Sequence, residues 1–322
     1  MITKDAIEQL VYKRCYKFLD KPVILTSGEA LTPFFLNGEN LIGDNAKNYS
    51  KFEMDPIGMM RFVRGELETS QDFRNSIEYV IENSNLRAIE YISGGRTRDW
   101  PFSAALAIMA NKKALFLYKP QDNQTPVVLD PKLENSIGYP QNLNGAKVFH
   151  IVDLVTSASS VTTEGGWLDQ IRLLNGNINR VYAAIDRNQG ATTKLKEREV
   201  KLESAVQINK DWLKTYDPKH TEVVQAYLKD TQKWSINYLS EKGLFCLLPY
   251  LISTNKEAQK DNRILKFIKE NNEQLTKTGL LEDILDISSN YKANTEIKKG
   301  LNGGESLIEA LHKYGVKIPM RT

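Results

Sequence analysis

A run of apolar residues that ends in a single acidic residue carries the clearest chemistry in this sequence. Residues 148–152 are mostly apolar and β-prone, and Asp153 follows them directly. The pattern predicts a buried parallel strand that delivers one carboxylate to its C-terminal end. A turn of small and hydroxyl residues comes next, formed by Thr156, Ser157, Ala158, Ser159 and Ser160. Small residues let the backbone approach an anion closely, and the N-terminus of a following helix offers free N–H groups to it.

The binding of a sugar phosphate is the chemistry that suits these residues. Asp153 would accept hydrogen bonds from ribose hydroxyls, and the turn would hold the 5′-phosphate through backbone N–H groups and hydroxyls. The same residues also fit an ordinary strand, turn and helix, in which Asp153 caps the helix N-terminus. The segment taken alone fits both interpretations.

Four other segments, together with this one, occur in the order found in the type I phosphoribosyltransferases and resemble those of orotate phosphoribosyltransferase. Residues 25–35 (Leu-Thr-Ser-Gly-Glu-Ala-Leu-Thr-Pro-Phe-Phe) resemble the family's base-site segment. Residues 93–100 (Ser-Gly-Gly-Arg-Thr-Arg-Asp-Trp) stand where the family has its pyrophosphate loop. A predicted strand at 114–118 ends at Lys119, where the family has basic residues before a mobile loop. Residues 184–190 (Ala-Ile-Asp-Arg-Asn-Gln-Gly) resemble the family's Asp-Arg-x-x-Gly motif.

The resemblance implies a pentosyltransferase that moves ribose 5-phosphate from phosphoribosyl diphosphate (PRPP) to a pyrimidine or related base and releases pyrophosphate. It also implies a homodimer and Mg²⁺ carried on the diphosphate. Asp153 and Lys119 would be catalytic, the first stabilising positive charge on the ribose and the second the departing pyrophosphate. The implied PRPP-binding residues are Thr156, Ser157, Ala158, Ser159, Ser160, Ser93, Gly94, Gly95 and Arg96. Those implied for the base are Arg187, Phe34 and Phe35.

Several of these residues have an ordinary structural alternative. Arg187 could form a surface ion pair instead of holding a carboxylated base, and Lys119 could be a solvated lysine at a strand end. Phe34 and Phe35 either stack on the base or close the N-terminal segment over the core. His150, in the middle of the predicted strand, is expected to be a hydrogen-bonded core histidine.

Three departures from the family bring a second class of protein into consideration. The family's PRPP loop has two adjacent acidic residues, and Val152 stands in place of the first. Its glycine-rich turn is replaced by residues 157–160, and no Lys or His like those of the family's mobile loop follows Lys119. These differences favour a non-catalytic protein on the same fold that senses PRPP or a nucleotide. A transferase for an unusual acceptor fits them as well.

Strand and helix patterns alternate over the region that carries these motifs. Strands are predicted at 88–92, 114–118, 148–152, 181–185 and 204–208, with helices around 101–111, 161–174 and 192–198. This alternation predicts an α/β fold with a parallel five-stranded sheet flanked by helices, similar to that of the type I phosphoribosyltransferases. The motif residues would then lie at the carboxyl ends of the strands, where such sheets bind ligands.

Three parts are predicted along the chain. Residues 1–50 would form an N-terminal helix (3–19) and a hood with the base-site segment, 51–210 the α/β core, and 211–322 an all-helical region. Helices in the last part are predicted at 220–240, 243–253, 256–271, 273–286 and 304–314. Residues 120–146 contain four prolines and no helical period, which predicts an active-site flap or, alternatively, a β-ribbon around residues 127–129.

Composition argues against several other classes of protein. The 322 residues carry 43 basic and 40 acidic side chains, a net charge of +3 that does not indicate a nucleic-acid-binding face. Cys15 and Cys246 form no metal-binding pattern. No signal peptide is predicted, and no apolar stretch approaches the ~20 residues that span a bilayer. We therefore expect a cytoplasmic protein with small-molecule substrates and with no nucleic-acid or membrane partner.

Overall fold

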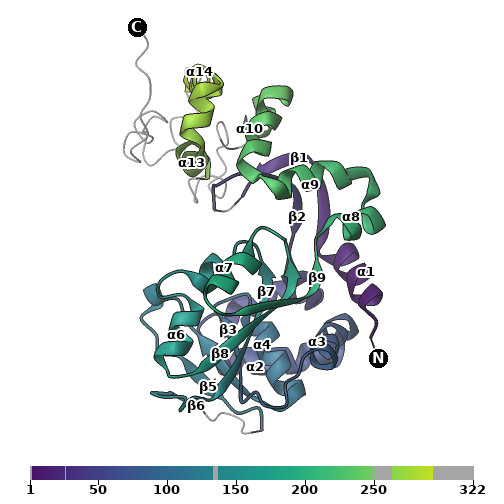
Figure 1. Ribbon diagram of the computed structural model, residues 1–322, viewed down its shortest axis with the longest axis vertical. Coiled ribbons are helices and arrows are strands. Elements are labelled where there is room, and N and C mark those ends of the chain that lie inside the picture. The colour runs from purple at the N-terminus through teal and green to yellow at the C-terminus, as the bar shows by residue number, and fades with distance from the viewer. Residues whose placement is uncertain (1, 26, 133–136, 249, 251–262, 293–322) are drawn as a thin grey trace. The chain divides into compact units, whose positions relative to one another are not determined.

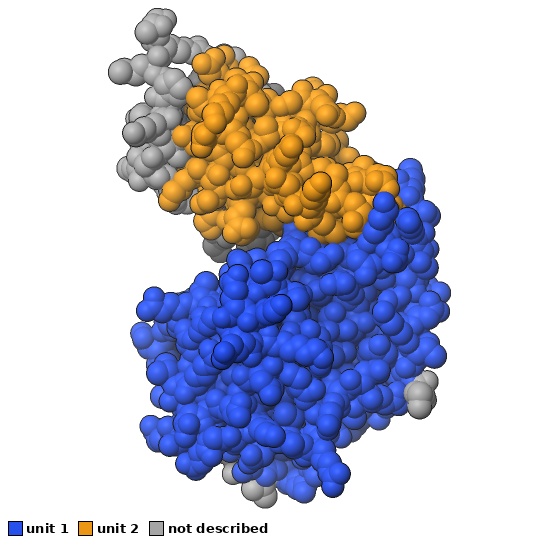
Figure 2. All heavy atoms as spheres, in the orientation of Figure 1, with its two compact units in different colours: residues 1–17, 36–219 blue, residues 18–35, 220–322 orange. Residues whose placement is uncertain are grey.

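The computed structural model describes residues 2–25, 27–132, 137–248, 250 and 263–292 (Figure 1). In it the chain folds into two compact units. Unit 1 consists of residues 1–17 and 36–219, and unit 2 consists of residues 18–35 and 220–322 (Figure 2). The predicted N-terminal part, residues 1–50, is therefore shared between the two units. Its middle segment belongs to the same unit as the C-terminal helices.

The centre of unit 1 is a seven-stranded sheet in the order β6-β5-β4-β3-β7-β8-β9 (Figure 1). Five of these strands are parallel: β3 Tyr91–Gly95, β4 Lys113–Leu117, β7 Lys147–Val155, β8 Asn177–Asp186 and β9 Lys201–Gln207. Numbered along the chain, the parallel strands are arranged 2-1-3-4-5. This doubly wound order binds ligands outside the carboxyl ends of the strands, at the switch point between the first and third. The predicted α/β fold with five parallel strands is confirmed.

The two further strands lengthen one edge of the sheet. β5 Val127–Leu129 pairs antiparallel with β4, and β6 Ile137–Gly138 pairs antiparallel with β5. They come from the proline-containing segment 120–146, of which residues 133–136 lie outside the described part. The described residues of this segment thus form the β-ribbon that was the alternative to an active-site flap.

Helices cover both faces of the sheet (Figure 1). On one face α4 Trp100–Ala110 packs against β3, β4 and β7, and α2 Pro56–Thr69 and α3 Gln71–Asn83 pack against α4. Trp100–Ala107 are all buried, so α4 is apolar around its whole circumference, as a helix between a sheet and two other helices must be. The other face carries α5 Ser159–Thr162, α6 Trp167–Leu173 and α7 Ala191–Glu197.

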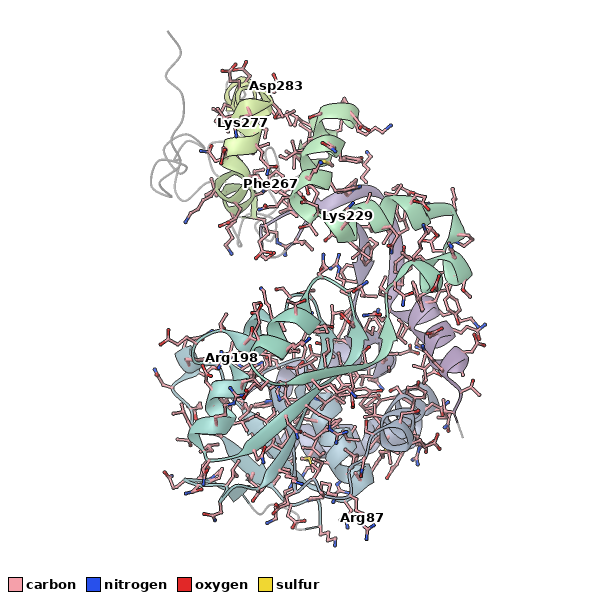
Figure 3. The ribbon with its side chains drawn as sticks, in the orientation of Figure 1. Arg87, Arg198, Lys229, Phe267, Lys277 and Asp283 are labelled. Carbon is pink, nitrogen blue, oxygen red and sulfur yellow. The ribbon has the colours of Figure 1, made fainter. Side chains whose placement is uncertain are left out.

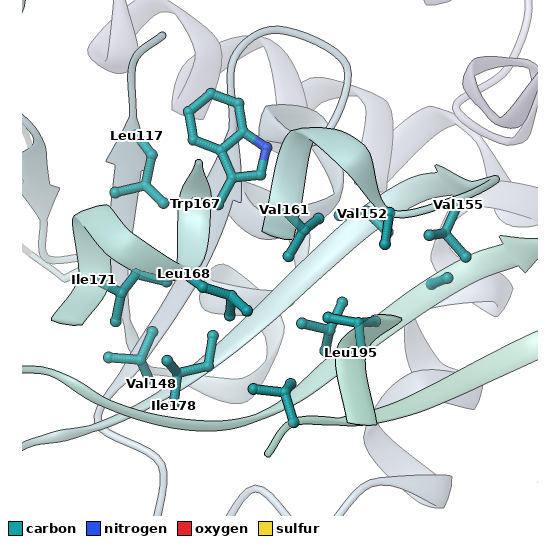
Figure 4. Packing of buried hydrophobic residues seen from close by; sticks show 14 of the residues in the cluster. Leu117, Val148, Val152, Val155, Val161, Trp167, Leu168, Ile171, Ile178 and Leu195 are labelled. Atoms are coloured by element: carbon teal, nitrogen blue, oxygen red, sulfur yellow. The ribbon is translucent and has the colours of Figure 1, made fainter. Parts of the chain in front are cut away.

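An apolar core fills the space between the sheet and α5–α7. Val148 and Val152 of β7 belong to it, together with Leu168 and Ile171 of α6 and Leu195 of α7 (Figure 4). Alternate residues of a strand face the same side of a sheet, which places Val148 and Val152 in the same core. Val152, which stands where an acidic residue was expected, is therefore a core residue.

The N-terminal helix is shorter than predicted. α1 Lys4–Arg14 begins at Thr3, whose hydroxyl accepts a hydrogen bond from the backbone N–H of Ala6 at 3.2 Å. Residues 16–24 then form β1, which pairs with β2 Leu31–Leu36. The prediction of a helix as far as residue 19 was wrong because pairing between strands, which is not local in sequence, overrides the apolar spacing there.

Unit 2 is mostly helical in the part that the structure describes. Its helices are α9 Thr221–Lys229, α10 Thr231–Lys242, α13 Arg263–Lys277 and α14 Leu280–Lys292; α8 Lys210–Tyr216 precedes them in unit 1. The predicted helix 220–240 is divided because Asp230 caps α10, accepting from the N–H of Lys233 at 2.9 Å. α13 buries Phe267 in the core, whereas the side chain of Lys277 is 70% exposed (Figure 3). The helix predicted at 304–314 lies outside the described residues.

The hood segment is held in unit 2 by hydrogen bonds as well as by apolar packing. The backbone N–H of Leu31 donates to the Ser235 hydroxyl at 2.9 Å, and the Asn271 amide donates to the carbonyl of Glu29 at 3.0 Å. Among the described helices of the whole chain, none has both the length and the apolar character needed to cross a membrane.

Candidate active site

A cavity of about 360 Å³ opens at the carboxyl ends of β3 and β7 in unit 1. Seven of the predicted site residues line it: Asp153, Thr156, Ala158, Ser159, Ser160, Arg96 and Lys119. Arg98, Asp99 and Trp167 line it as well. The cavity lies at the switch point of the strand order, where a doubly wound sheet is expected to bind its ligand.

Asp153 lies near the end of β7 and is almost completely buried, with 2% of its surface exposed. Its Oδ2 has no hydrogen-bond partner among the described residues, and the nearest cation is Arg98, with Nε 3.8 Å from that oxygen. Gly38 packs directly on this residue: a Cβ at position 38 would lie 2.8 Å from the Asp153 carbonyl oxygen. The carboxylate is therefore fixed by its surroundings, and one of its oxygens is left for a donor.

Asp99, from the connection after β3, lies against Asp153. The backbone N–H of Asp153 donates to Asp99 Oδ1 at 3.1 Å, and the two carboxyl groups lie close enough for one to donate to the other when it is protonated. Burial raises the pKa of Asp99, and the charge of Asp153 raises it further. Burial also raises the pKa of Asp153, which the Arg98 guanidinium opposes. The two groups together favour one shared proton over two charges.

Arg98 joins this pair to a third carboxyl group. Its Nε lies 3.7 Å from Glu39 Oε1, and its side chain remains 53% exposed. Glu39 belongs to the short helix Gly38–Leu41 and also accepts from the Tyr49 hydroxyl, whose pKa is raised by burial and by this bond. Arg98 therefore makes two long ion pairs, to the buried Asp153 and the partly buried Glu39, and its own half-exposed guanidinium remains accessible to a phosphate.

The turn after β7 contains one residue whose backbone has a left-handed conformation, which glycine takes most easily. Ala158 has φ 56° and ψ 25°, in the left-handed region, and its carbonyl accepts from the N–H groups of Val161 and Thr162. This conformation costs a residue with a Cβ about 1–2 kcal/mol. Ser159 and Ser160 are exposed at the start of α5, where they line the cavity.

The loop after β3 differs from its prediction. Ser93 is fully buried within β3 and does not line the cavity, and its hydroxyl hydrogen-bonds to Nδ1 of His150 at 2.9 Å. Burial lowers the pKa of His150 to about 3, and its Nε2 has no hydrogen-bond partner among the described residues. His150 is thus a neutral core histidine, with one of its two nitrogens hydrogen-bonded.

Gly94 and Gly95 are buried strand residues, whereas a tight phosphate-binding turn was predicted. A Cβ at Gly94 would lie 2.5 Å from the Ser103 hydroxyl oxygen, and one at Gly95 would lie 2.1 Å from the indole ring of Trp167. The two glycines are therefore required by the packing of α4 and α6 against β3. The turn itself begins one residue later, at Arg96, and the Arg96–Thr97 peptide bond is cis.

Arg96 is held by two carboxylates, although it lines the cavity. Its guanidinium donates to Asp122 and, at 3.0 Å, to Glu53. Lys119 is exposed, and its backbone N–H donates to Asp122 at 2.8 Å. The Lys119 side chain is therefore better placed than that of Arg96 to meet an anion.

The residues predicted to contact the base do not line this cavity. Arg187 is 5% exposed at the end of β8, and its backbone N–H donates to the Val155 carbonyl at 2.9 Å. The neighbouring Asp186 accepts from the Asn188 N–H at 2.7 Å and from Gln207 at 3.0 Å, and burial raises its pKa. These bonds fix the segment that carries Arg187 beside the end of β7.

Phe34 and Phe35 belong to unit 2. Phe34 is 0% exposed and packs edge-to-face on Tyr227, with 5.7 Å between ring centroids. This is the core-packing alternative of the sequence analysis, because a fully buried ring has no free face for a base. Phe35, at 50% exposure, keeps a free ring.

Metal-binding capacity is limited in the described part of the chain. No group of three or more His, Cys, Asp or Glu side chains there could hold a metal ion. Mg²⁺ carried on a substrate diphosphate needs no such cage, because it keeps water ligands and phosphate oxygens. The residues present are compatible with that mode of binding.

Two acidic neighbours of Asp153 were missed as site residues. Asp99 comes seven residues after the predicted strand 88–92, whereas Asp153 directly follows the strand 148–152, so the signal used for Asp153 does not extend to Asp99. Glu39 carries no comparable signal. Only the approach of Gly38 to β7 brings Glu39 to Arg98.

No protein-family model matches the chain, and no curated protein does. Solved structures do. Orotate phosphoribosyltransferase from Aeropyrum pernix is 16% identical with a TM-score of 0.44, over 65% of this chain and 98% of that chain. UMP synthase from Leishmania donovani is 14% identical with a TM-score of 0.44, over 69% of this chain and 41% of that chain. Adenine phosphoribosyltransferase from Thermoanaerobacter pseudethanolicus is 17% identical with a TM-score of 0.36, over 46% of this chain and 86% of that chain.

Unit 1 has the architecture that the sequence predicts, a doubly wound α/β fold with a parallel five-stranded sheet flanked by helices. Five parallel strands in the order 2-1-3-4-5 carry helices on both faces. The loops after β3 and β7, which the resemblance singles out, meet at one cavity at the carboxyl edge of that sheet. The additional C-terminal helices are present beside this fold.

Proposed function

We propose that this protein is a phosphoribosyltransferase that binds PRPP in the cavity of unit 1 and transfers its ribose 5-phosphate group to a base. The observation that carries the proposal is the Asp153 carboxylate, which is buried at the cavity and has one oxygen without a hydrogen-bond partner among the described residues. The turn that would take the 5′-phosphate, residues 156–160, follows it directly. One strand end thus offers a group for each part of a ribose phosphate.

In the proposed reaction, the bond between ribose C1 and the diphosphate oxygen breaks, and a bond from C1 to a ring nitrogen of the base forms. Positive charge develops on the ribose in the transition state, and a fixed carboxylate at Asp153 stabilises it. Arg98 and Lys119 would neutralise the departing pyrophosphate. Mg²⁺ bound to the diphosphate would supply further charge neutralisation.

The acceptor in this proposal is a pyrimidine or related base with a carboxylate, such as orotate. Arg187, fixed at the end of β8, would pair with the carboxylate, as the sequence resemblance implies. The active form would be a homodimer in the cytoplasm.

A non-catalytic protein that senses PRPP is the second candidate. The Arg96 guanidinium is occupied by Asp122 and Glu53, and Ala158 takes a conformation in which glycine is favoured. Both features weaken phosphate contacts without closing the cavity. Binding of PRPP without turnover is what this candidate predicts.

Orotate consumption with PRPP and Mg²⁺, followed by the ultraviolet absorbance of the base, tests the proposal. Consumption that requires PRPP and falls by a factor of about 100 in Asp153→Ala would support it, because a charged hydrogen bond contributes about 1.5–3 kcal/mol. Asp211→Asn, on an exposed turn of α8, is the matched control and should leave the rate unchanged. Absence of consumption together with calorimetric PRPP binding would favour the sensor, and absence of both would refute the proposal.

A further inference from the structure

Asp99, from the loop after β3, and Asp153, near the end of β7, meet at the wall of the cavity. The backbone bond between them is 3.1 Å long, and their carboxyl groups lie close enough for one to donate to the other when it is protonated. An ionised carboxylate only accepts hydrogen bonds, so a bond between two carboxyl groups requires a proton on one of them. Asp99 therefore acts on Asp153 in two ways, as the acceptor of its backbone N–H and as its partner in sharing a proton.

This arrangement leaves one oxygen of the pair available. Asp153 Oδ2 is buried and has no hydrogen-bond partner among the described residues, and Arg98 Nε is 3.8 Å away, which is beyond hydrogen-bond distance. A buried polar atom without a partner is uncommon in a folded protein. At the wall of a cavity, it indicates a place for a donor on a ligand.

We propose that Asp99 is a positioning residue that holds the Asp153 carboxylate through a shared proton, so that Asp153 Oδ2 accepts from a ribose hydroxyl. The inference rests on the proposed function, because the ribose is that of PRPP. It deepens that function in one respect: the second acidic group of the site comes from the loop after β3. Val152, the residue next to Asp153, lies in the apolar core and supplies none.

The proposal makes ribose binding depend on pH. Other titratable groups that act on the pair are Arg98, Glu39, Tyr49 and Cys15, and Lys119 lines the same cavity. The pKa of Asp99 in the folded protein is raised above its ordinary value of 3.8. As pH rises through that raised value, the shared proton is lost, two adjacent carboxylates repel each other, and the held position of Asp153 is lost. Affinity for ribose and stability of the fold should therefore both decline with rising pH.

Asp99→Asn separates this role from a merely structural one. The amide accepts from the Asp153 N–H as the carboxyl does, and it donates to the Asp153 carboxylate at every pH. Its binding of ribose should therefore not decline with pH. Asp99→Ala removes both bonds and should weaken binding throughout the pH range.

Calorimetric titration of the full chain with ribose 5-phosphate between pH 4 and pH 10, a range that extends upward from the ordinary pKa of an aspartate, tests this. Comparing each variant with the wild type at the same pH cancels the titration of the ligand's own phosphate. Asp99→Asn should match the wild type at low pH and bind about tenfold more tightly at high pH, whereas Asp99→Ala should bind about tenfold less tightly at pH 6. Asp211→Asn should follow the wild type.

Each outcome bears on a different claim. The shared proton would be overturned if the affinity of Asp99→Asn relative to the wild type stayed constant across the pH range. It would also be overturned if Asp99→Ala bound as tightly as the wild type. In both cases the proposed function would stand. Failure of the wild type to bind either ribose 5-phosphate or PRPP would overturn both proposals. Where thermal denaturation shows that Asp99→Ala does not fold, the ratio for Asp99→Asn decides alone.

Discussion

The loops after β3 and β7 have similar sequence signals but different structural roles. Both follow a predicted strand and contain small residues. The first also has basic residues, and the second has an acidic one, at positions predicted to bind PRPP. After β7, Asp153 and four residues of the turn line the cavity, namely Thr156, Ala158, Ser159 and Ser160. After β3, most of the predicted groups serve packing: Ser93 bonds to His150, and Gly95 makes room for Trp167. A sequence motif thus predicts where a loop lies, while its neighbours decide which of its atoms are free.

The largest effect is expected for Val152→Asp, which adds a second acidic residue next to Asp153 at the end of β7. Val152 also lines the cavity, but it is only 3% exposed and packs in the core between the sheet and α5–α7, so a carboxylate there would be buried largely among apolar side chains. We expect a loss of about 3–5 kcal/mol in the free energy of unfolding, measured by urea denaturation. Val152→Ala, which stays apolar, should lose only about 2 kcal/mol. A stable Val152→Asp protein with increased PRPP affinity would mean that this side chain faces the cavity.

Gly95→Ala tests whether the glycines after β3 serve packing. The added methyl group would overlap the Trp167 ring, so we expect a loss of about 3 kcal/mol in the free energy of unfolding. Gly65→Ala in α2, with no atom within 4 Å of the new methyl group, is the matched control and should stabilise the fold by about 1 kcal/mol. Equal denaturation midpoints for the two variants would refute the packing role.

Substitution of Arg96 should mainly lower the stability of the fold, and substitution of Arg98 should mainly weaken the binding of PRPP. Arg96 is held by Asp122 and Glu53, and its removal in Arg96→Ala should cost about 2 kcal/mol of stability. Arg98 is half-exposed but is the nearest cation to the buried Asp153, so Arg98→Ala should cost about 1 kcal/mol of stability, less than Arg96→Ala. The same variant should weaken PRPP binding by a factor of about ten, since it removes a charged phosphate donor. Denaturation and calorimetry on both variants give the comparison, which the reverse assignment of the two effects would contradict.

The smallest effect is expected at Ala158. Glycine would remove the cost of the left-handed backbone, which is about 1–2 kcal/mol. It would also lose a buried methyl group and increase the entropy of the unfolded chain, and both of these lower the stability of the fold. We expect Ala158→Gly to change the free energy of unfolding by less than about 1 kcal/mol. Ala158→Val, with a β-branched side chain in the same conformation, should lose stability. A large gain in Ala158→Gly would show that the turn after β7 carries more strain than its packing offsets.

The five parallel strands and the helices between them were predictable because their signals are local. Apolar runs such as 148–152, bounded by turn residues, specify buried strands without reference to the rest of the chain. The position of Asp153 and of the turn after it follows from the same pattern. The β-ribbon at 127–129 and the strand at 16–24 were harder, because both depend on pairing with a distant strand.

The division of the site residues required the tertiary structure. Phe34 and Phe35 are adjacent in sequence, yet one is buried on Tyr227 and the other is half-exposed, because neighbouring residues of a strand face opposite sides. Glu39 is distant in sequence from Asp153, and only the packing of Gly38 on β7 brings it near Arg98.

The sequence by itself determined the α/β architecture of unit 1 and the end of the sheet at which a ligand would bind. These follow from apolar periodicity and from the handedness of strand connections, which apply to every chain. The tertiary structure alone decided which polar atoms remain without partners. That outcome depends on what each side chain meets after folding: Ser93 meets His150 and is occupied, whereas Asp153 meets Asp99 and keeps one oxygen for a ligand.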